Sequence, residues 1–193
     1  MPYCVRSRLL ALRWAILALF LVSTSMAAPA LTLSAGDAAI RPMLGGGNLY
    51  AEGEVAGYVR VPKAGTYRLT VQAYGSPCDG EWPRMALSIN GLAREAVDVD
   101  SESFAPYSFT FKLSAHVHSV GVAFLNDDWG LTGDRNLYLD TLTLEPAADG
   151  PDPERSTEAA WKKDGPAREQ AVLDATEAAI QRHRMGRAEL TVL

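Results

Sequence analysis

Apolar and polar residues alternate through much of the region 31–146. In 66–74, Tyr67, Leu69, Val71 and Ala73 recur at every second position, and 107–113 repeats this pattern. A period of two places apolar side chains on one face of a strand. Further short strand-like runs are 57–62, 84–89, 95–99, 119–125 and 137–144. About eight short strands separated by turn residues predict an all-β jelly-roll β-sandwich for 31–146.

Two turns are predicted within this region. Asn90-Gly91 follows a strand-like run and is a strong hairpin signal. Lys63-Ala64-Gly65 separates two alternating runs and predicts a second hairpin. The aromatic side chains in alternating positions are expected in the core; they are Tyr67, Phe109, Phe111 and Phe124.

The composition changes after Pro146. Residues 147–156 are rich in Pro, Asp and Gly and predict a linker. We expect a helical extension over 157–193, with a short helix capped by Ser156 that ends at Asp164-Gly165-Pro166, a second helix over 167–184 and a final strand over 188–193.

The first thirty residues form a separate segment. Arg6, Arg8 and Arg13 precede an apolar run over 15–22, and small residues follow. This pattern is typical of a secretory signal peptide, with cleavage after Ala27 or Ala30. The alternative, an uncleaved anchor, disagrees with the length of the run, because a spanning helix needs about 20 apolar residues. Residues 1–30 therefore predict a secreted or periplasmic protein that is free of the membrane after cleavage.

Charge and cysteine content narrow the function further. The full chain has a net charge of −5, and 31–146 holds fourteen acidic against eight basic residues, a net of −6. Binding to nucleic acid requires a basic face, so a neutral polysaccharide or a cation is the better partner. Cleavage would leave Cys78 as the one cysteine, which excludes an intramolecular disulfide and favours a buried thiol.

Candidate chemistry concentrates in 126–140. This segment contains four Asp and two Asn around two Gly and one Trp, between two strand-like runs. Calcium accepts about 6–8 oxygen ligands from carboxylates, amides and backbone carbonyls. The same residues can instead shape a turn through Asx hydrogen bonds. Trp82 and Trp129 fall in loops, where they either contact a ligand or cover the end of the sandwich.

The segments Phe124-Leu125-Asn126-Asp127 and 133–140 resemble the calcium-dependent xylan-binding modules of carbohydrate-binding module family 60, which are related to family 36. The likeness extends over about 31–144. It implies a jelly-roll sandwich with a loop-bound calcium that coordinates neighbouring sugar hydroxyls. It implies Asp127, Asp134, Asn136 and Asp128 as metal ligands, with Asp140 as a further candidate. It implies that Trp129 contributes a carbonyl or an aromatic face and that Arg135 orients a carboxylate. Asn126 and Trp82 are further candidates for ligand contact.

A weaker resemblance lies in 178–193, which is similar to the lead-in to catalytic domains of glycoside hydrolase family 10 xylanases. It implies that a catalytic domain follows and that the chain is the targeting part of a xylan-degrading enzyme.

We therefore expect a secreted, non-catalytic module that binds a β-linked plant polysaccharide, xylan above all, through Ca²⁺. Two other classes stay open at this point. One is an adhesion or assembly domain with a purely structural calcium. The other is a glycosidase that uses Asp127 and Asp134 as its carboxylate pair.

Overall fold

The computed structural model describes residues 30–43, 45–147 and 150–185. The predicted signal segment 1–29 and the predicted strand 188–193 lie outside these residues. The elements, in chain order, are β1 (Leu31–Ser34), η1 (Ala35–Asp37), β2 (Gly53–Arg60), β3 (Gly65–Ser76), β4 (Arg84–Ile89), β5 (Leu92–Asp98), β6 (Ala105–Leu113), β7 (Val117–Phe124), β8 (Trp129–Gly130), β9 (Gly133–Asp134), β10 (Asn136–Pro146), β11 (Glu154–Arg155) and α1 (Glu158–Met185).

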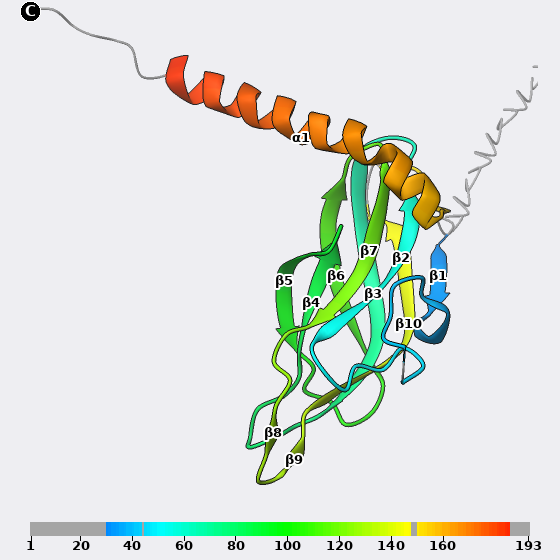
Figure 1. Ribbon diagram of the computed structural model, residues 1–193, viewed down its shortest axis with the longest axis vertical. Helices are drawn as coiled ribbons and strands as arrows, with labels where there is room; N and C mark the ends of the chain where they lie inside the picture. The colour runs from blue at the N-terminus through cyan, green and yellow to red at the C-terminus, as the bar shows by residue number, and fades with distance from the viewer. Residues whose placement is uncertain (1–29, 44, 148–149, 186–193) are drawn as a thin grey trace, which may run out of the picture.

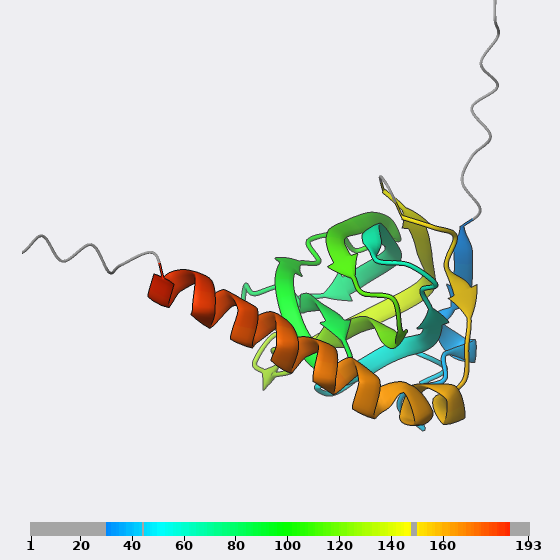
Figure 2. The same ribbon diagram turned by 90° about the horizontal axis from the view of Figure 1, so that it is seen from above.

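Two antiparallel sheets form a sandwich, which confirms the predicted fold class (Figure 1). The four-stranded sheet has the order β1-β10-β3-β6, and the five-stranded sheet has the order β11-β2-β7-β4-β5. A small third sheet pairs β8 with β9. The helix α1 crosses the end of the sandwich opposite to β8 and β9 and extends past it (Figures 1 and 2).

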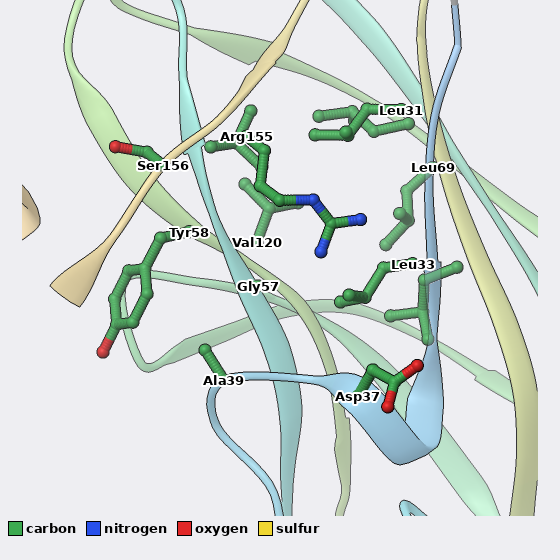
Figure 3. A pocket seen from close by; sticks show the side chains of 13 residues that line it. Leu31, Leu33, Asp37, Ala39, Gly57, Tyr58, Leu69, Val120, Arg155 and Ser156 are labelled. Atoms are coloured by element: carbon green, nitrogen blue, oxygen red, sulfur yellow. The ribbon is translucent and has the colours of Figure 1, made fainter.

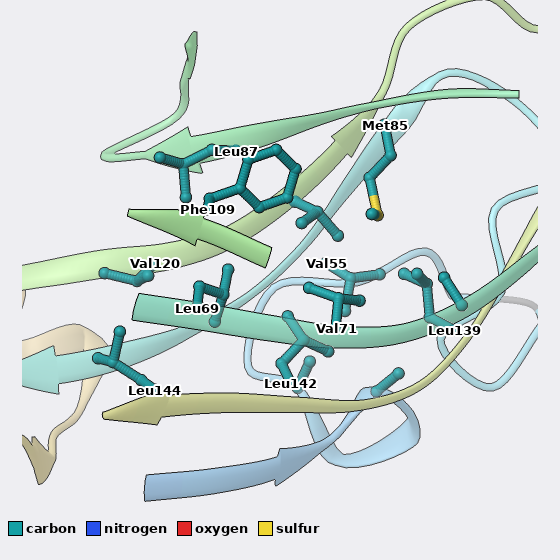
Figure 4. Packing of buried hydrophobic residues seen from close by; sticks show 14 of the residues in the cluster. Val55, Leu69, Val71, Met85, Leu87, Phe109, Val120, Leu139, Leu142 and Leu144 are labelled. Carbon is teal, nitrogen blue, oxygen red and sulfur yellow. The ribbon is translucent and has the colours of Figure 1, made fainter. Parts of the chain in front are cut away.

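The core lies between the facing sheets and follows the predicted alternation. Leu69 and Val71 of β3 point inward toward Phe109, Leu87 and Val120 (Figure 4). The predicted core aromatics Tyr67, Phe109 and Phe124 are buried, and Phe111 packs against the cluster. Burial of apolar side chains is the main favourable term in folding, so this layer holds the sandwich together.

The two predicted turns have different outcomes. Asn90 and Gly91 have φ of 55° and 74° and connect the paired residues Ile89 and Leu92, so the predicted Asn-Gly hairpin is confirmed. The hairpin predicted at 63–65 is wrong, because β2 pairs with β7 and β11 whereas β3 pairs with β10 and β6. The chain there crosses from one sheet to the other. Each of β2 and β3 packs its inward apolar face against the opposite sheet. A local turn signal is the same whether the chain crosses between sheets or forms a hairpin, so it cannot distinguish the two.

The C-terminal part also differs from the sequence prediction. Glu154 and Arg155, in the predicted linker, pair with Val59 and Arg60 and so form an edge strand. The helix α1 is continuous through Pro166 and begins after Thr157, whose Oγ accepts a hydrogen bond from Ala160 N at 3.2 Å. The predicted break at 164–166 and the predicted cap at Ser156 are therefore wrong.

Contacts with the sandwich explain why α1 continues through Pro166. Asp164 Oδ2 accepts from Val117 N at 2.6 Å, and Arg168 Nη1 donates to Val117 O at 2.8 Å. Trp161 packs on Tyr58 with ring centroids 5.9 Å apart. These contacts offset the local cost of proline in a helix. No helix within the described residues is long and apolar enough to cross a bilayer.

An apolar cavity of about 80 Å³ lies between the sheets near β1 and β11 (Figure 3). Leu31, Leu33 and Val120 are among its lining residues, and Arg155 covers it while donating to Thr32 O at 3.1 Å. None of its lining residues belongs to the segment 126–140 described next.

Candidate functional site

The oxygen-rich segment forms a projecting hairpin at the end of the sandwich opposite to α1 (Figure 1). Trp129 pairs with Asp134 and Gly130 with Gly133, so the two halves of the segment lie side by side. Gly133 has a φ of 145°, a conformation that favours glycine. The pairing brings Asp127 and Asp128, which precede β8, next to Asp134 and Asn136, which end and follow β9.

Arg135 holds this end of the molecule together. Its side chain is buried and donates to three backbone carbonyls: Nε to Glu81 O at 3.2 Å, Nη1 to Asn126 O at 2.8 Å and Nη2 to Cys78 O at 2.9 Å. Its guanidinium also lies 3.8 Å from the Asp128 carboxylate. The expectation that Arg135 orients a carboxylate agrees with this pair, but its larger role is to bind the loops to each other.

A tight turn at Asp79-Gly80 fastens the neighbouring loop. Asp79 has a φ of 49° and Gly80 a φ of 83°. The Asp79 carboxylate accepts from Thr132 Oγ1 at 3.0 Å and from Thr132 N at 3.2 Å, and these hydrogen bonds lower its pKa. A Cβ at Gly130 would lie 2.0 Å from Asp79 Oδ2, so only glycine fits there. Sequence reasoning missed Asp79, although its Asp-Gly pair is a turn signal.

Asn136 carries an unusual unpaired atom. The residue is 6 % exposed, and its Nδ2 donates to Asp134 Oδ2 at 3.0 Å and to Asp134 O at 3.3 Å. Its Oδ1 is buried without a hydrogen-bond partner. The amide orientation is determined by its neighbours, because the Asp134 backbone carbonyl can only accept. A buried unpaired carbonyl costs about 1–3 kcal/mol, so this oxygen fits a ligand that supplies positive charge.

The surrounding charge also favours a cation. Partial burial raises the pKa of Asp127, and the nearby carboxylates of Asp134, Glu52 and Asp128 raise it further. Four acidic groups therefore repel one another around this loop. Glu52 was not among the predicted residues, because it lies far from the motif in the sequence and only the fold brings it close.

Carboxylate, amide and backbone oxygens are the donor atoms that calcium binds. Within the described residues, no group of three His, Cys, Asp or Glu side chains is arranged to hold a metal. Calcium, however, also accepts amide and backbone oxygens and tolerates irregular geometry. The groups here that could hold such an ion are the unpaired Asn136 oxygen and the Asp134 and Asp127 carboxylates.

The other predicted residues have distinct environments. Trp129 is 84 % exposed in β8, and its side chain is available to a ligand. Asn126 is structural: its Oδ1 accepts from Arg84 N at 2.6 Å and its Nδ2 donates to Trp82 O at 3.0 Å. Trp82 is half-buried, and Asp140 is exposed on β10.

The buried Cys78 thiol donates to Gly133 O at 3.3 Å, which confirms the expectation of a buried cysteine. The thiol therefore packs against the hairpin that β8 and β9 form.

These features define a class: a β-sandwich with an oxygen-rich loop at one end that fits a cation. Residues 68–158 match the model of carbohydrate-binding module family 60, described as a Ca-dependent, xylan-binding carbohydrate-binding module. The resemblance to this family that was found in the sequence is confirmed over these residues. The match begins inside β3 and ends at the first residue of α1, so it contains the whole loop but not Glu52.

Several solved structures are similar to the chain. A family 35 module from Cellvibrio japonicus Abf62 has 16 % identity and a TM-score of 0.46, over 67 % of this chain and 99 % of that one. A family 36 module in complex with calcium and xylotriose has 16 % identity and a TM-score of 0.41, over 60 % and 99 %. A ruminal GH26 endo-beta-1,4-mannanase has 21 % identity and a TM-score of 0.44 over 61 % of this chain, which spans 26 % of the mannanase.

All three TM-scores lie below 0.5, so the fold assignment rests on the two sheets themselves. The comparison with curated proteins gave no match.

Proposed function

We propose that this chain is a secreted or periplasmic, non-catalytic module that binds a β-linked plant polysaccharide, xylan first, and targets an attached glycoside hydrolase to it. The family match to a xylan-binding description supports this ligand class. The observation that carries the proposal is the buried, unpaired Oδ1 of Asn136 beside the Asp134 carboxylate.

Calcium bound at this loop would supply open coordination positions for two neighbouring hydroxyls of a sugar. Asp134, Asn136 and Asp127 would hold it, and Asp128 would contribute while paired with Arg135. Arg135 keeps the loops in place through its three carbonyl contacts, so the oxygens are positioned before the ligand arrives. The exposed Trp129 ring offers an apolar surface beside the site.

Calorimetric titration with xylohexaose tests the proposal, once in calcium and once in EDTA. Binding in calcium alone is the expected result, and Asp134→Asn should abolish it. Asp140→Asn is the matched control, because this carboxylate is exposed on β10, outside the hairpin that β8 and β9 form. Binding that survives EDTA would refute the calcium contact.

Two outcomes would favour the other classes. A calcium-dependent rise in stability without binding to any glycan would favour the adhesion domain with a structural calcium. Release of shorter products from xylohexaose by this chain alone would favour the glycosidase.

A further inference from the structure

The outer face of the four-stranded sheet carries a row of aromatic side chains close to the candidate site. We call Tyr50, Tyr74, Phe104 and Tyr138 the aromatic row. Tyr74 and Tyr138 are cross-strand partners with stacked rings 4.3 Å apart. Phe104 meets Tyr74 edge-on at 4.8 Å, and Tyr50 meets Tyr138 edge-on at 5.8 Å. Four rings from four separate segments of the chain therefore form one continuous surface.

The row is accessible at both ends. Phe104 is 52 % exposed and Tyr50 is 48 % exposed, whereas Tyr74 and Tyr138 between them are half-buried. Isolated exposed aromatics are common, but a contiguous group with polar surroundings marks a binding surface. The core packing does not require these rings, because the alternating residues Leu69, Val71 and Ala73 of β3 supply it from the other face.

The aromatic row is continuous with the candidate site. Asn136 and Tyr138 are two positions apart on β10, so their side chains lie on the same face of the strand. Ser76, the cross-strand partner of Asn136, donates from Oγ to Asp134 O at 2.8 Å.

Beyond the row, the same face is lined by hydroxyl groups. Thr70 and Ser108 share a hydrogen bond at 3.0 Å, and Thr32 and Thr143 share one at 3.1 Å. Arg68 and Glu145 pair with each other at 3.5 Å near the end of β10 farthest from the loop. Aromatic rings and hydroxyls with few free charges suit a neutral polysaccharide better than a charged protein surface or a nucleic acid.

We propose that this face extends the binding site, and that the aromatic row holds further sugar residues of the glycan chain whose first unit is bound at the loop. This inference rests on the proposed function, because the loop would hold the first of these sugar residues. Apolar C–H faces of the sugar rings would pack on Tyr50 and Phe104, and their hydroxyls would reach the phenols and the threonines. The module would therefore bind several consecutive residues of one chain.

Titration with xylo-oligosaccharides from two to six residues, in calcium, tests this extension. Wild type should gain affinity with length. Phe104→Ala and Tyr50→Ala should leave binding of the shortest sugar unchanged and weaken binding of xylohexaose about tenfold, the effect of one lost aromatic contact. Leu92→Ala is the matched control, because Leu92 is a 58 % exposed apolar residue on the other sheet. Calcium affinity should be unchanged in all three variants, and thermal unfolding should show that each remains folded.

The outcomes separate this inference from the proposed function. Calcium-dependent binding with the same length dependence in wild type and Phe104→Ala would overturn the extension alone. Binding that resists EDTA but is weakened by Phe104→Ala would support the aromatic row and overturn the calcium contact. No binding of any length would overturn both. A dimer in sedimentation experiments that Phe104→Ala dissociates would make the row a contact between copies and also overturn the extension.

Discussion

The sharpest prediction concerns Asn136→Leu, which replaces the amide by an apolar group of similar size. Its effect without calcium follows from two opposing contributions. The substitution removes the unpaired buried oxygen, which costs wild type about 1–3 kcal/mol, and loses two hydrogen bonds from Nδ2 to Asp134, each worth about 1 kcal/mol. The free energy of unfolding in EDTA should therefore change by no more than about 1 kcal/mol.

The effect with calcium should be much larger. A ligand at 100 times its Kd stabilises the folded state by about 2.7 kcal/mol. For a chain of this size, 1 kcal/mol shifts the melting temperature by about 2–4 °C. Wild type should gain roughly 5–10 °C from calcium at that concentration, and Asn136→Leu should gain little of this.

Differential scanning calorimetry in a calcium series and in EDTA measures both quantities. Asp140→Asn should respond to calcium as wild type does, because Asp140 is exposed and lies four residues farther along β10. An undiminished calcium shift in Asn136→Leu would exclude the amide oxygen as a ligand. A loss above about 3 kcal/mol in EDTA would refute the assignment of a costly unpaired oxygen.

Three further predictions concern groups around the site and under the helix. Asp127→Asn should raise stability at neutral pH in EDTA, because the raised pKa of Asp127 reflects repulsion and burial, and should lower calcium affinity, both measured by thermal unfolding in a calcium series. Arg135→Lys should cost at least about 3 kcal/mol in urea unfolding, because one ammonium cannot serve three separate carbonyls; a loss below 1 kcal/mol would contradict its role in joining the loops. Burial lowers the pKa of His118 below its ordinary 6.5, so below that pH the unfolded chain binds more protons than the folded chain and the free energy of unfolding should fall. His118→Gln should remove this fall in urea unfolding measured across the pH range. An unchanged pH profile in this variant would refute the role of His118.

The sequence by itself determined the sandwich and much of the loop. The alternation over 66–74 and 107–113 predicted the strands β3 and β6 and which of their side chains face the core. It could do so because the side-chain period of a strand depends only on local geometry. The Asn90-Gly91 hairpin followed from the conformations that these two residues adopt readily. The oxygen-rich motif indicated a calcium site, because calcium selects ligands by atom type, and the family resemblance implied Asp127, Asp134 and Asn136 as its candidate ligands.

Only the tertiary structure decided how distant segments meet. It separated β2 from β3 into different sheets, carried α1 through Pro166 and used Glu154 and Arg155 as an edge strand. It also brought Glu52 beside Asp127 and assembled the aromatic row. These outcomes depend on contacts between residues far apart in the chain, whose energies outweigh the local preferences that a sequence pattern expresses.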